Sequence, residues 1–168
     1  MNRNLLLIGL GMLLVTALVG IFLSQVGEPE VEQPIAFNHK KHIDNGLTCS
    51  VCHQYVEKYA SAGLPKGEIC LLCHMVPLSE NPEEQKVRDY AERGEEIPWK
   101  RVYKLADHAY FSHMRHVTLG KVECVACHGN MPERSTPLTR PIVKMTMDFC
   151  LNCHEQTKAS RDCIACHR

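Results

Sequence analysis

Residues 37–53 read FNHKKHIDNGLTCSVCH, and residues 111–128 read FSHMRHVTLGKVECVACH. Each stretch begins with the pattern Phe-x-His-x-x-His and ends, after a short loop, with Cys-x-x-Cys-His. An internal repeat of this kind indicates units that pack together because neither buries its apolar surface alone. The repeat predicts one domain over residues 35–168, built from two modules at about 35–78 and 97–168.

All ten cysteines fall into five Cys-x-x-Cys-His motifs, which we number motif 1 to motif 5 in chain order. Residues three apart lie on one face of a helical turn, so both thiols reach one porphyrin while the next histidine projects toward its iron. Such motifs are typical of covalent haem c attachment. The sequence predicts five haem c groups, tethered in pairs by Cys49 and Cys52, Cys70 and Cys73, Cys124 and Cys127, Cys150 and Cys153, and Cys163 and Cys166. The predicted proximal iron ligands are His53, His74, His128, His154 and His167.

Two other readings of the cysteine pairs are disulfide redox sites and zinc sites. A redox disulfide leaves the histidine after each pair unexplained. Structural zinc takes four ligands, and five identical pairs cannot be divided evenly among such sites. Haem attachment therefore accounts for the pattern better than either alternative.

Five of the ten histidines lie outside the motifs, which equals the number of distal iron positions. The predicted distal ligands are His39, His42, His108, His113 and His116. His108 stands alone in the sequence, and Met147, three residues before Cys150, is the alternative to it. An iron held by two protein ligands has no open position for substrate, so no catalytic residue is predicted, and the expected role is electron transfer.

Composition also indicates that side chains do not fill the interior. Aromatic residues make up only 6% of the chain, which is too little for an ordinary core in a domain of this size. We expect a mostly α-helical and irregular fold, a small multihaem cytochrome c organised by five haems. The 19 basic and 19 acidic side chains balance, and haem propionates add negative charge, so nucleic acid is not expected as a partner.

The N-terminal region is apolar from Leu5 to Leu23 and is preceded by Arg3. A helix over this stretch measures roughly 28 Å, close to the thickness of a bilayer core. It predicts a single-pass transmembrane anchor over residues 1–26 and a linker over residues 27–34, with a cleaved signal as the alternative. The positive-inside rule then places the haem domain on the periplasmic side of the cytoplasmic membrane.

A helix is expected between the modules, over about residues 82–93. Asn81 suits the N-cap, Pro82 the first helical position, and Glu84 the last position of a capping box, while Gly94 suits the end. Further along, residues 117–122 are compatible with a short strand.

The pattern Phe-x-His-x-x-His followed by Cys-x-x-Cys-His resembles class III cytochromes c and their three-haem relatives. This resemblance implies that the first histidine of each pair serves the haem attached next in sequence. His39 would then serve motif 1 and His113 motif 3, while His42 and His116 would reach other haems.

A narrower resemblance covers the stretch Ile97–His116, residues 124–129 (CVACHG) and residues 147–154 (MDFCLNCH). These are similar to the multihaem subunit of alternative complex III, which matches the five-haem count better, and of the related menaquinone reductase complexes. The resemblance implies an electron-transfer subunit that relays electrons between the quinone-linked part of a complex and other redox subunits or a periplasmic carrier. Its implied partners are an integral membrane quinone-binding subunit, an iron–sulfur subunit and membrane lipid. The alternatives are a self-sufficient, membrane-tethered quinol dehydrogenase and a stand-alone electron shuttle.

Overall fold

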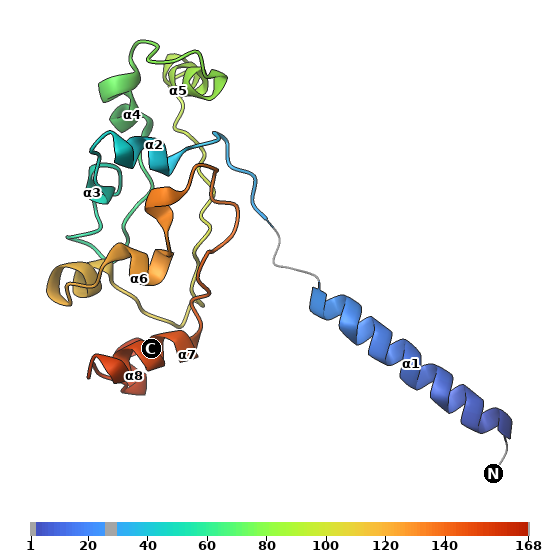
Figure 1. The fold of residues 1–168 in the computed structure, drawn as a ribbon. Coiled ribbons are helices and arrows are strands. Elements are labelled where there is room, and N and C mark those ends of the chain that lie inside the picture. The colour runs from blue at the N-terminus through green and yellow to red at the C-terminus, as the bar shows by residue number, and fades with distance from the viewer. Residues whose placement is uncertain (1–2, 26–29, 168) are drawn as a thin grey trace. The chain divides into compact units, whose positions relative to one another are not determined.

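The computed structural model describes residues 3–25 and 30–167 of the chain (Figure 1). The chain divides into two compact units, Met1–Glu30 and Val31–Arg168. The first unit contains α1 (Arg3–Gln25), and the second contains every cysteine and histidine. The predicted site therefore belongs to the second unit.

Helix α1 does not bear out the predicted membrane anchor. Within the residues that the structure describes, no helix is long and apolar enough to cross a membrane. The prediction of a single-pass anchor over residues 1–26 is thus wrong. The predictions of a periplasmic location and of contact with membrane lipid were based on that anchor and are wrong with it. Residues 1, 2 and 26 of that segment, and 27–29 of the predicted linker, lie outside the described residues.

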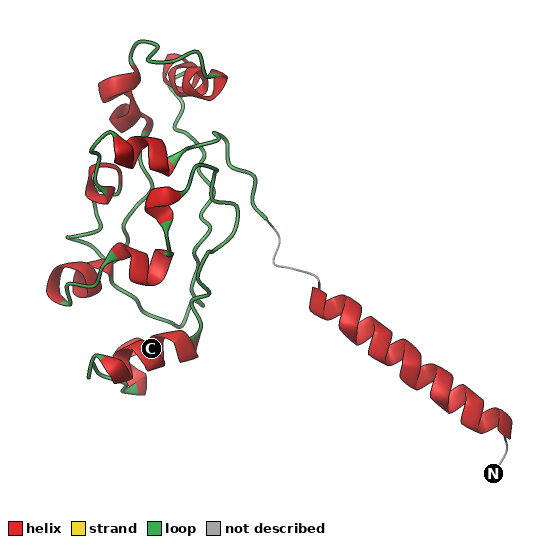
Figure 2. Ribbon diagram, in the orientation of Figure 1, coloured by secondary structure: helices red, strands yellow, loops and turns green. Residues whose placement is uncertain are grey.

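The second unit consists of short helices joined by long loops (Figure 2). The helices are α2 (His39–Asp44), α3 (Cys49–Cys52), α4 (Gly67–His74), α5 (Pro82–Glu92), the π-helix η1 (Met114–Leu119), α6 (Cys124–His128), the 3₁₀ turn η2 (Met131–Glu133), α7 (Met147–Gln156) and α8 (Cys163–Cys166). No strand occurs among the described residues, although an isolated antiparallel bridge joins Ala109 to His167. The mostly α-helical and irregular fold class is confirmed, and the short strand expected over residues 117–122 is wrong.

Helix α5 lies where the sequence predicts a helix between the modules. The Asn81 side chain caps it by accepting a hydrogen bond from the Glu83 amide at 3.0 Å, and Pro82 occupies the first turn. Gly94 follows the helix with φ = +67°, a left-handed conformation that glycine adopts without strain. The local capping signals therefore determine both ends of α5.

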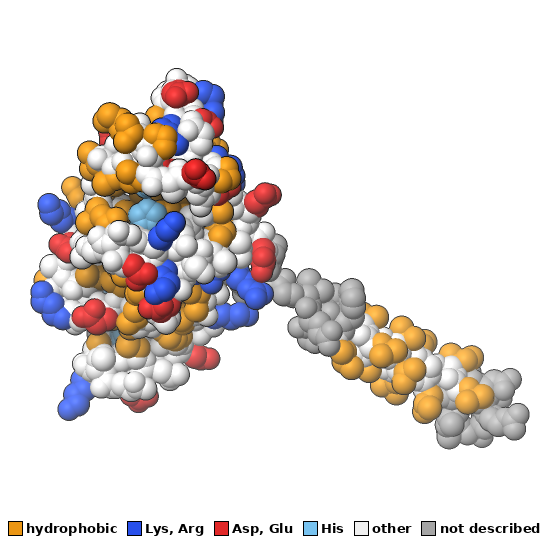
Figure 3. All heavy atoms as spheres, turned by 45° about the horizontal axis from the view of Figure 1, so that its top comes forward, with side chains coloured by type: hydrophobic (Ala, Val, Ile, Leu, Met, Phe, Trp, Pro, Cys, Tyr) orange, Lys and Arg blue, Asp and Glu red, His pale blue; other side chains and the backbone are white. Residues whose placement is uncertain are grey.

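The side-chain core of the second unit is small. Among the described residues, the buried apolar side chains are Ile35, Val56, Val87 and Ile97. Three of them form a cluster, with Cys70, Leu71, Tyr90 and Trp99 packed against it. Many other apolar side chains lie on the surface, as Figure 3 shows. So few buried side chains cannot by themselves stabilise a domain of this length.

The two modules predicted from the repeat interlock. The amides of His113 and Met114 donate hydrogen bonds to the carbonyls of Ala60 and Tyr59, at 3.0 and 3.1 Å. The Thr118 hydroxyl donates a third bond, 2.7 Å long, to a carbonyl of the same segment. The beginning of η1 is therefore fixed in place by the loop that follows motif 1.

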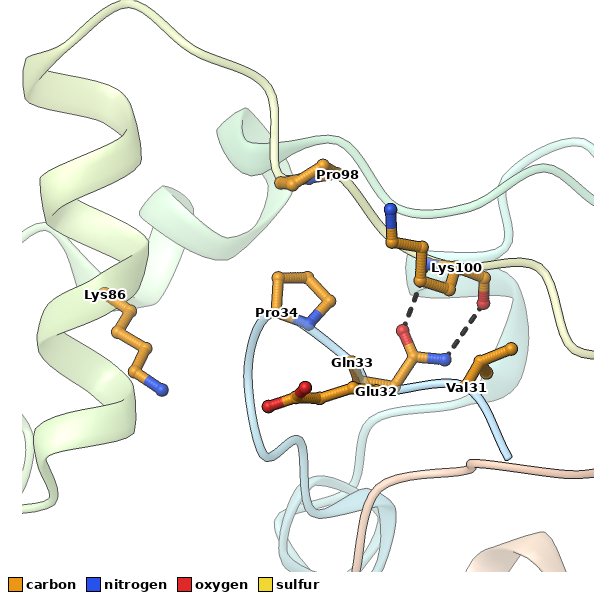
Figure 4. Close-up of a pocket in the computed structure, with 7 residues that line it drawn as sticks. All are labelled: Val31, Glu32, Gln33, Pro34, Lys86, Pro98 and Lys100. Carbon is orange, nitrogen blue, oxygen red and sulfur yellow. Dashed lines mark hydrogen bonds between the residues drawn. The ribbon is translucent and has the colours of Figure 1, made fainter. Parts of the chain in front are cut away.

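Residues 31–34, the end of the predicted linker, are held within the second unit. The Gln33 amide donates hydrogen bonds of 2.9 Å to the carbonyls of Lys100 and Leu138, and it accepts one from the Lys100 amide (Figure 4). An open cavity of about 490 Å³ lies beside it, lined by Val31, Glu32, Gln33, Pro34, Lys86, Pro98 and Lys100. No cysteine or histidine lines this cavity, so it is separate from the predicted haem ligands.

Candidate haem-binding sites

The two cysteines of each Cys-x-x-Cys-His motif lie on one short helix: α3, α4, α6, α7 and α8 carry motifs 1 to 5 in order, and the histidine follows directly as the C-cap of α3 and of α8. Side chains just before some of these helices define where they begin. Thr146 accepts a hydrogen bond from the Phe149 amide before α7, and Asp162 accepts one from the Ile164 amide before α8. None of the ten cysteines is in a disulfide, and the helical turn places the two of each motif on one face.

The first Phe-x-His-x-x-His element organises two histidines around one phenylalanine ring. Phe37 stacks on His42 with ring centroids 4.4 Å apart and an interplanar angle of 26°. It meets His39 edge-on, at 4.8 Å and 85°. The two imidazoles are therefore held in different orientations by the same aromatic side chain.

The second element repeats this geometry. Phe111 stacks on His116 at 4.4 Å and 25°, and it meets His113 edge-on at 4.9 Å and 90°. The backbones differ, since η1 is a π-helix and α2 is an α-helix. The sequence repeat is thus a structural repeat at the level of individual rings.

Histidines of the motifs face histidines from elsewhere in the chain. An iron bound on both faces by imidazole nitrogens at about 2 Å holds the two ring centroids roughly 6 Å apart. His113 and His128 lie 6.3 Å apart with an interplanar angle of 6°. His42 and His74 lie 6.0 Å apart. Both separations suit a shared iron.

Two further pairs have similar separations. His116 and His154 lie 6.0 Å apart, and His108 and His167 lie 5.3 Å apart. His108 reaches motif 5 because the Tyr110 amide donates a 2.7 Å hydrogen bond to the Cys166 carbonyl, next to the Ala109–His167 bridge. The pairing of His108 could not be predicted from spacing, since 59 residues separate it from its partner.

The remaining pair is His39 with His53. Burial, followed by the proximity of His53, lowers the pKa of His39 to about 4. The Nδ1 atom of His39 is buried and makes no hydrogen bond. A neutral imidazole is the form that binds a metal, so this environment suits a ligand. Four of the five predicted distal histidines thus lie ring to ring with a different motif histidine, and His39 is close enough to His53 for the charge of His53 to affect its pKa.

Backbone carbonyls orient most of these rings through Nδ1. When Nδ1–H donates to a carbonyl, the Nε2 lone pair is left free to coordinate, which is the usual arrangement around metal-binding histidines. These Nδ1–carbonyl contacts are His42 to Asn38 (2.8 Å), His53 to Gly63 (3.0 Å), His113 to Ala60 (2.9 Å), His116 to Ser112 (2.8 Å), His154 to Ser160 (2.6 Å) and His167 to His108 (3.4 Å). The local backbone therefore sets the tautomer at both repeat elements and at three further motifs.

Gly63 is required for one of these contacts. It has φ = +73°, and a Cβ atom there would lie 2.7 Å from Cδ2 of Tyr55. The loop that presents the Gly63 carbonyl to His53 therefore excludes a side chain at this position.

Thiols of different motifs also lie close together. Burial is the main cause that raises the pKa of four of these thiols, and the second cause is the charge of a cysteine in another motif. The pairs of affected thiol and neighbouring cysteine are Cys70 with Cys52, Cys124 with Cys49, Cys127 with Cys153, and Cys150 with Cys166. These neighbours connect motif 2 to 1, 1 to 3, 3 to 4, and 4 to 5. The motifs therefore form a row in the order 2–1–3–4–5, and Figure 1 shows the same order from α4 at the top to α8 at the bottom.

One side chain differs from its sequence-based assignment. Glu84 does not complete a capping box; its carboxylate instead accepts hydrogen bonds from the segment before α5 and approaches His74. No local sequence signal distinguishes it from the other acidic residues of α5. Met147, the alternative to His108, has a side chain 62% exposed at the start of α7.

Comparison with known proteins shows the family of the chain. The family model described as cytochrome c7 and related cytochrome c matches residues 35–88 and 109–168. The multihaem cytochrome c subunit of a menaquinone reductase from Nitratidesulfovibrio vulgaris (strain Hildenborough) is 32% identical over 162 residues, covering 82% of this chain and 77% of the relative. The chain belongs to the cytochrome c7 and related cytochrome c family and is a small multihaem cytochrome c.

Proposed function

We propose that this chain is the electron-transfer subunit of a menaquinone reductase-type complex and carries five haem c groups. The observation that carries the proposal is the set of four close imidazole pairs, each joining one motif histidine to one histidine from outside the motifs. The name of the relative, a menaquinone reductase subunit, supplies the type of complex. Each bound haem would supply a one-electron carrier.

The residues divide into tethers and axial ligands. The ten motif cysteines would hold the haems covalently, and the motif histidines would bind each iron from the proximal side. The distal ligands for motifs 1 to 5 would be His39, His42, His113, His116 and His108. Ring separations of 5.3–6.3 Å in four pairs support this assignment.

His108 is a better candidate than Met147 for the distal position at motif 5. Its ring lies 5.3 Å from that of His167, and the bridge beside it fixes the intervening backbone. The Met147 side chain is mostly exposed and belongs to the helix of motif 4.

Histidine on both faces of every iron favours a relay over catalysis. With both axial positions filled by the chain, substrate has no route to the metal. The row of motifs, 2–1–3–4–5, would then be a path for electrons with motif 2 at one end and motif 5 at the other. Electrons would pass between the quinone-linked part of the complex and a separate redox subunit or carrier.

Purification tests the subunit assignment. A tagged chain isolated from its native cells under mild detergent is expected to bring down a quinone-binding subunit and an iron–sulfur subunit, in fixed stoichiometry across successive columns. The fraction is identified by haem staining and mass spectrometry. Recovery of the haem-loaded chain as a monomer, at its natural abundance, would contradict the subunit role.

A further inference from the structure

Among the residues that the structure describes, Glu84 is the buried acidic residue, and several neighbouring groups bond to its carboxylate. Its side chain is 7% exposed. One carboxylate oxygen accepts a 2.6 Å hydrogen bond from the Leu78 amide and pairs with Arg88 at 3.0 Å. The other accepts a 2.7 Å bond from the Ser79 hydroxyl. Burial of a carboxylate is costly, and these three donors offset that cost.

The same carboxylate faces an expected iron ligand. His74 Nδ1 is buried and makes no hydrogen bond, and it lies 3.3 Å from Glu84 Oε1 in an ion-pair contact. The proximal histidines of motifs 1, 4 and 5 instead direct Nδ1 at backbone carbonyls. Among the histidines that the structure describes, His74 is therefore unusual in facing a carboxylate.

A carboxylate partner changes the electronic character of a ligand more than a carbonyl does. It accepts the Nδ1 proton more strongly, which makes the imidazole a better electron donor to the metal. A stronger donor and a nearby negative charge both stabilise ferric over ferrous iron. Hydrogen bonds from Leu78 and Ser79 and the ion pair with Arg88 all stabilise the charged form of this carboxylate.

We infer that Glu84 is a positioning residue that lowers the reduction potential of the haem on motif 2, at the α4 end of the row. The inference rests on the proposed assignment of His74 as an iron ligand. It deepens that assignment, because it gives the two ends of the row different electronic environments.

The test is a potentiometric titration of the haem-loaded chain with Glu84→Gln. Glutamine keeps the size and one acceptor oxygen but removes the charge. One of the five one-electron components is expected to become at least tenfold easier to reduce, a shift of about 59 mV, and one low-spin signal in the electron paramagnetic resonance spectrum should change with it.

The matched control is Glu83→Gln, on the same helix and with the same change in charge. The Glu83 carboxylate accepts a 2.6 Å hydrogen bond from the Ala36 amide and is paired with Lys86 rather than with a histidine. A comparable shift in this variant would show a general effect of charge and would overturn the inference.

A second variant, Ser79→Ala, keeps the charge of the site unchanged. It removes the hydrogen bond that the Ser79 hydroxyl donates to the carboxylate, which should make Glu84 a stronger acceptor for the His74 Nδ1 proton. The reduction potential of the same haem is therefore expected to fall rather than rise. Titration curves of Glu84→Gln and Ser79→Ala that both overlay the unmodified protein would overturn the inference while leaving five haems in place. A haem count below five would overturn the proposed function instead.

Discussion

Chains produced without haem attachment are expected to lack the fold of the Val31–Arg168 unit. The described part of this unit buries only four apolar side chains, and most of its helices are one or two turns long. Short helices are marginal in water without packing partners. The bound haems would supply the missing apolar contacts, much as structural metals do in small domains.

Far-UV circular dichroism and amide hydrogen exchange measure this effect. The comparison is between the chain made in cells with and without haem c maturation. The haem-loaded protein should protect amides of α4 and α5, whereas the haem-free chain should exchange them at unfolded rates and show no cooperative thermal transition. A cooperative transition in the haem-free chain would mean that side chains alone form an adequate core.

The double substitution Cys124→Ser and Cys127→Ser is expected to divide the row of haems. Motif 3 joins motif 1 to motif 4, through Cys49 on one side and Cys153 on the other. Without its haem, motifs 2 and 1 are separated from motifs 4 and 5, so rapid-mixing reduction should become biphasic. Stability should fall by at least about 3–5 kcal/mol, the cost of deleting one large aromatic side chain from a core.

The matched control is Cys163→Ser with Cys166→Ser, which removes the haem at one end. This variant also retains four haems, but motifs 2, 1, 3 and 4 remain contiguous, so reduction should stay in a single phase. Equal kinetics in the two double variants, with four haems confirmed in each, would contradict the order 2–1–3–4–5.

Much of the candidate site could be predicted from local sequence. The Cys-x-x-Cys-His motifs fix the cysteine and histidine spacing within one helical turn. The repeated Phe-x-His-x-x-His element predicted two similar units, and its rings adopt nearly the same geometry in both copies. The signals at Asn81, Pro82 and Gly94 likewise predicted α5 to within one residue.

Contacts between distant segments could not be predicted in this way. The pairing of His42 with His74 and the approach of Glu84 to His74 depend on how α4 packs against α5 and α2. The segment at residues 114–119 is a π-helix because the Gly120 amide bonds to the Arg115 carbonyl, five residues back, rather than continuing as a strand. The predicted anchor depended on hydropathy and length read from the sequence alone, and among the described residues no helix is both long and apolar enough to cross a membrane.

A haem count combined with spin-state spectroscopy tests most directly the claim that five irons are each held between two imidazoles. The purified chain is assayed by pyridine haemochrome against its protein mass, and its oxidised form is examined by electron paramagnetic resonance. The expected result is five haems per chain, all low-spin with bis-histidine signals and without the optical band of methionine-bound ferric haem. Fewer than five haems, or a high-spin iron in the intact chain, would contradict the claim.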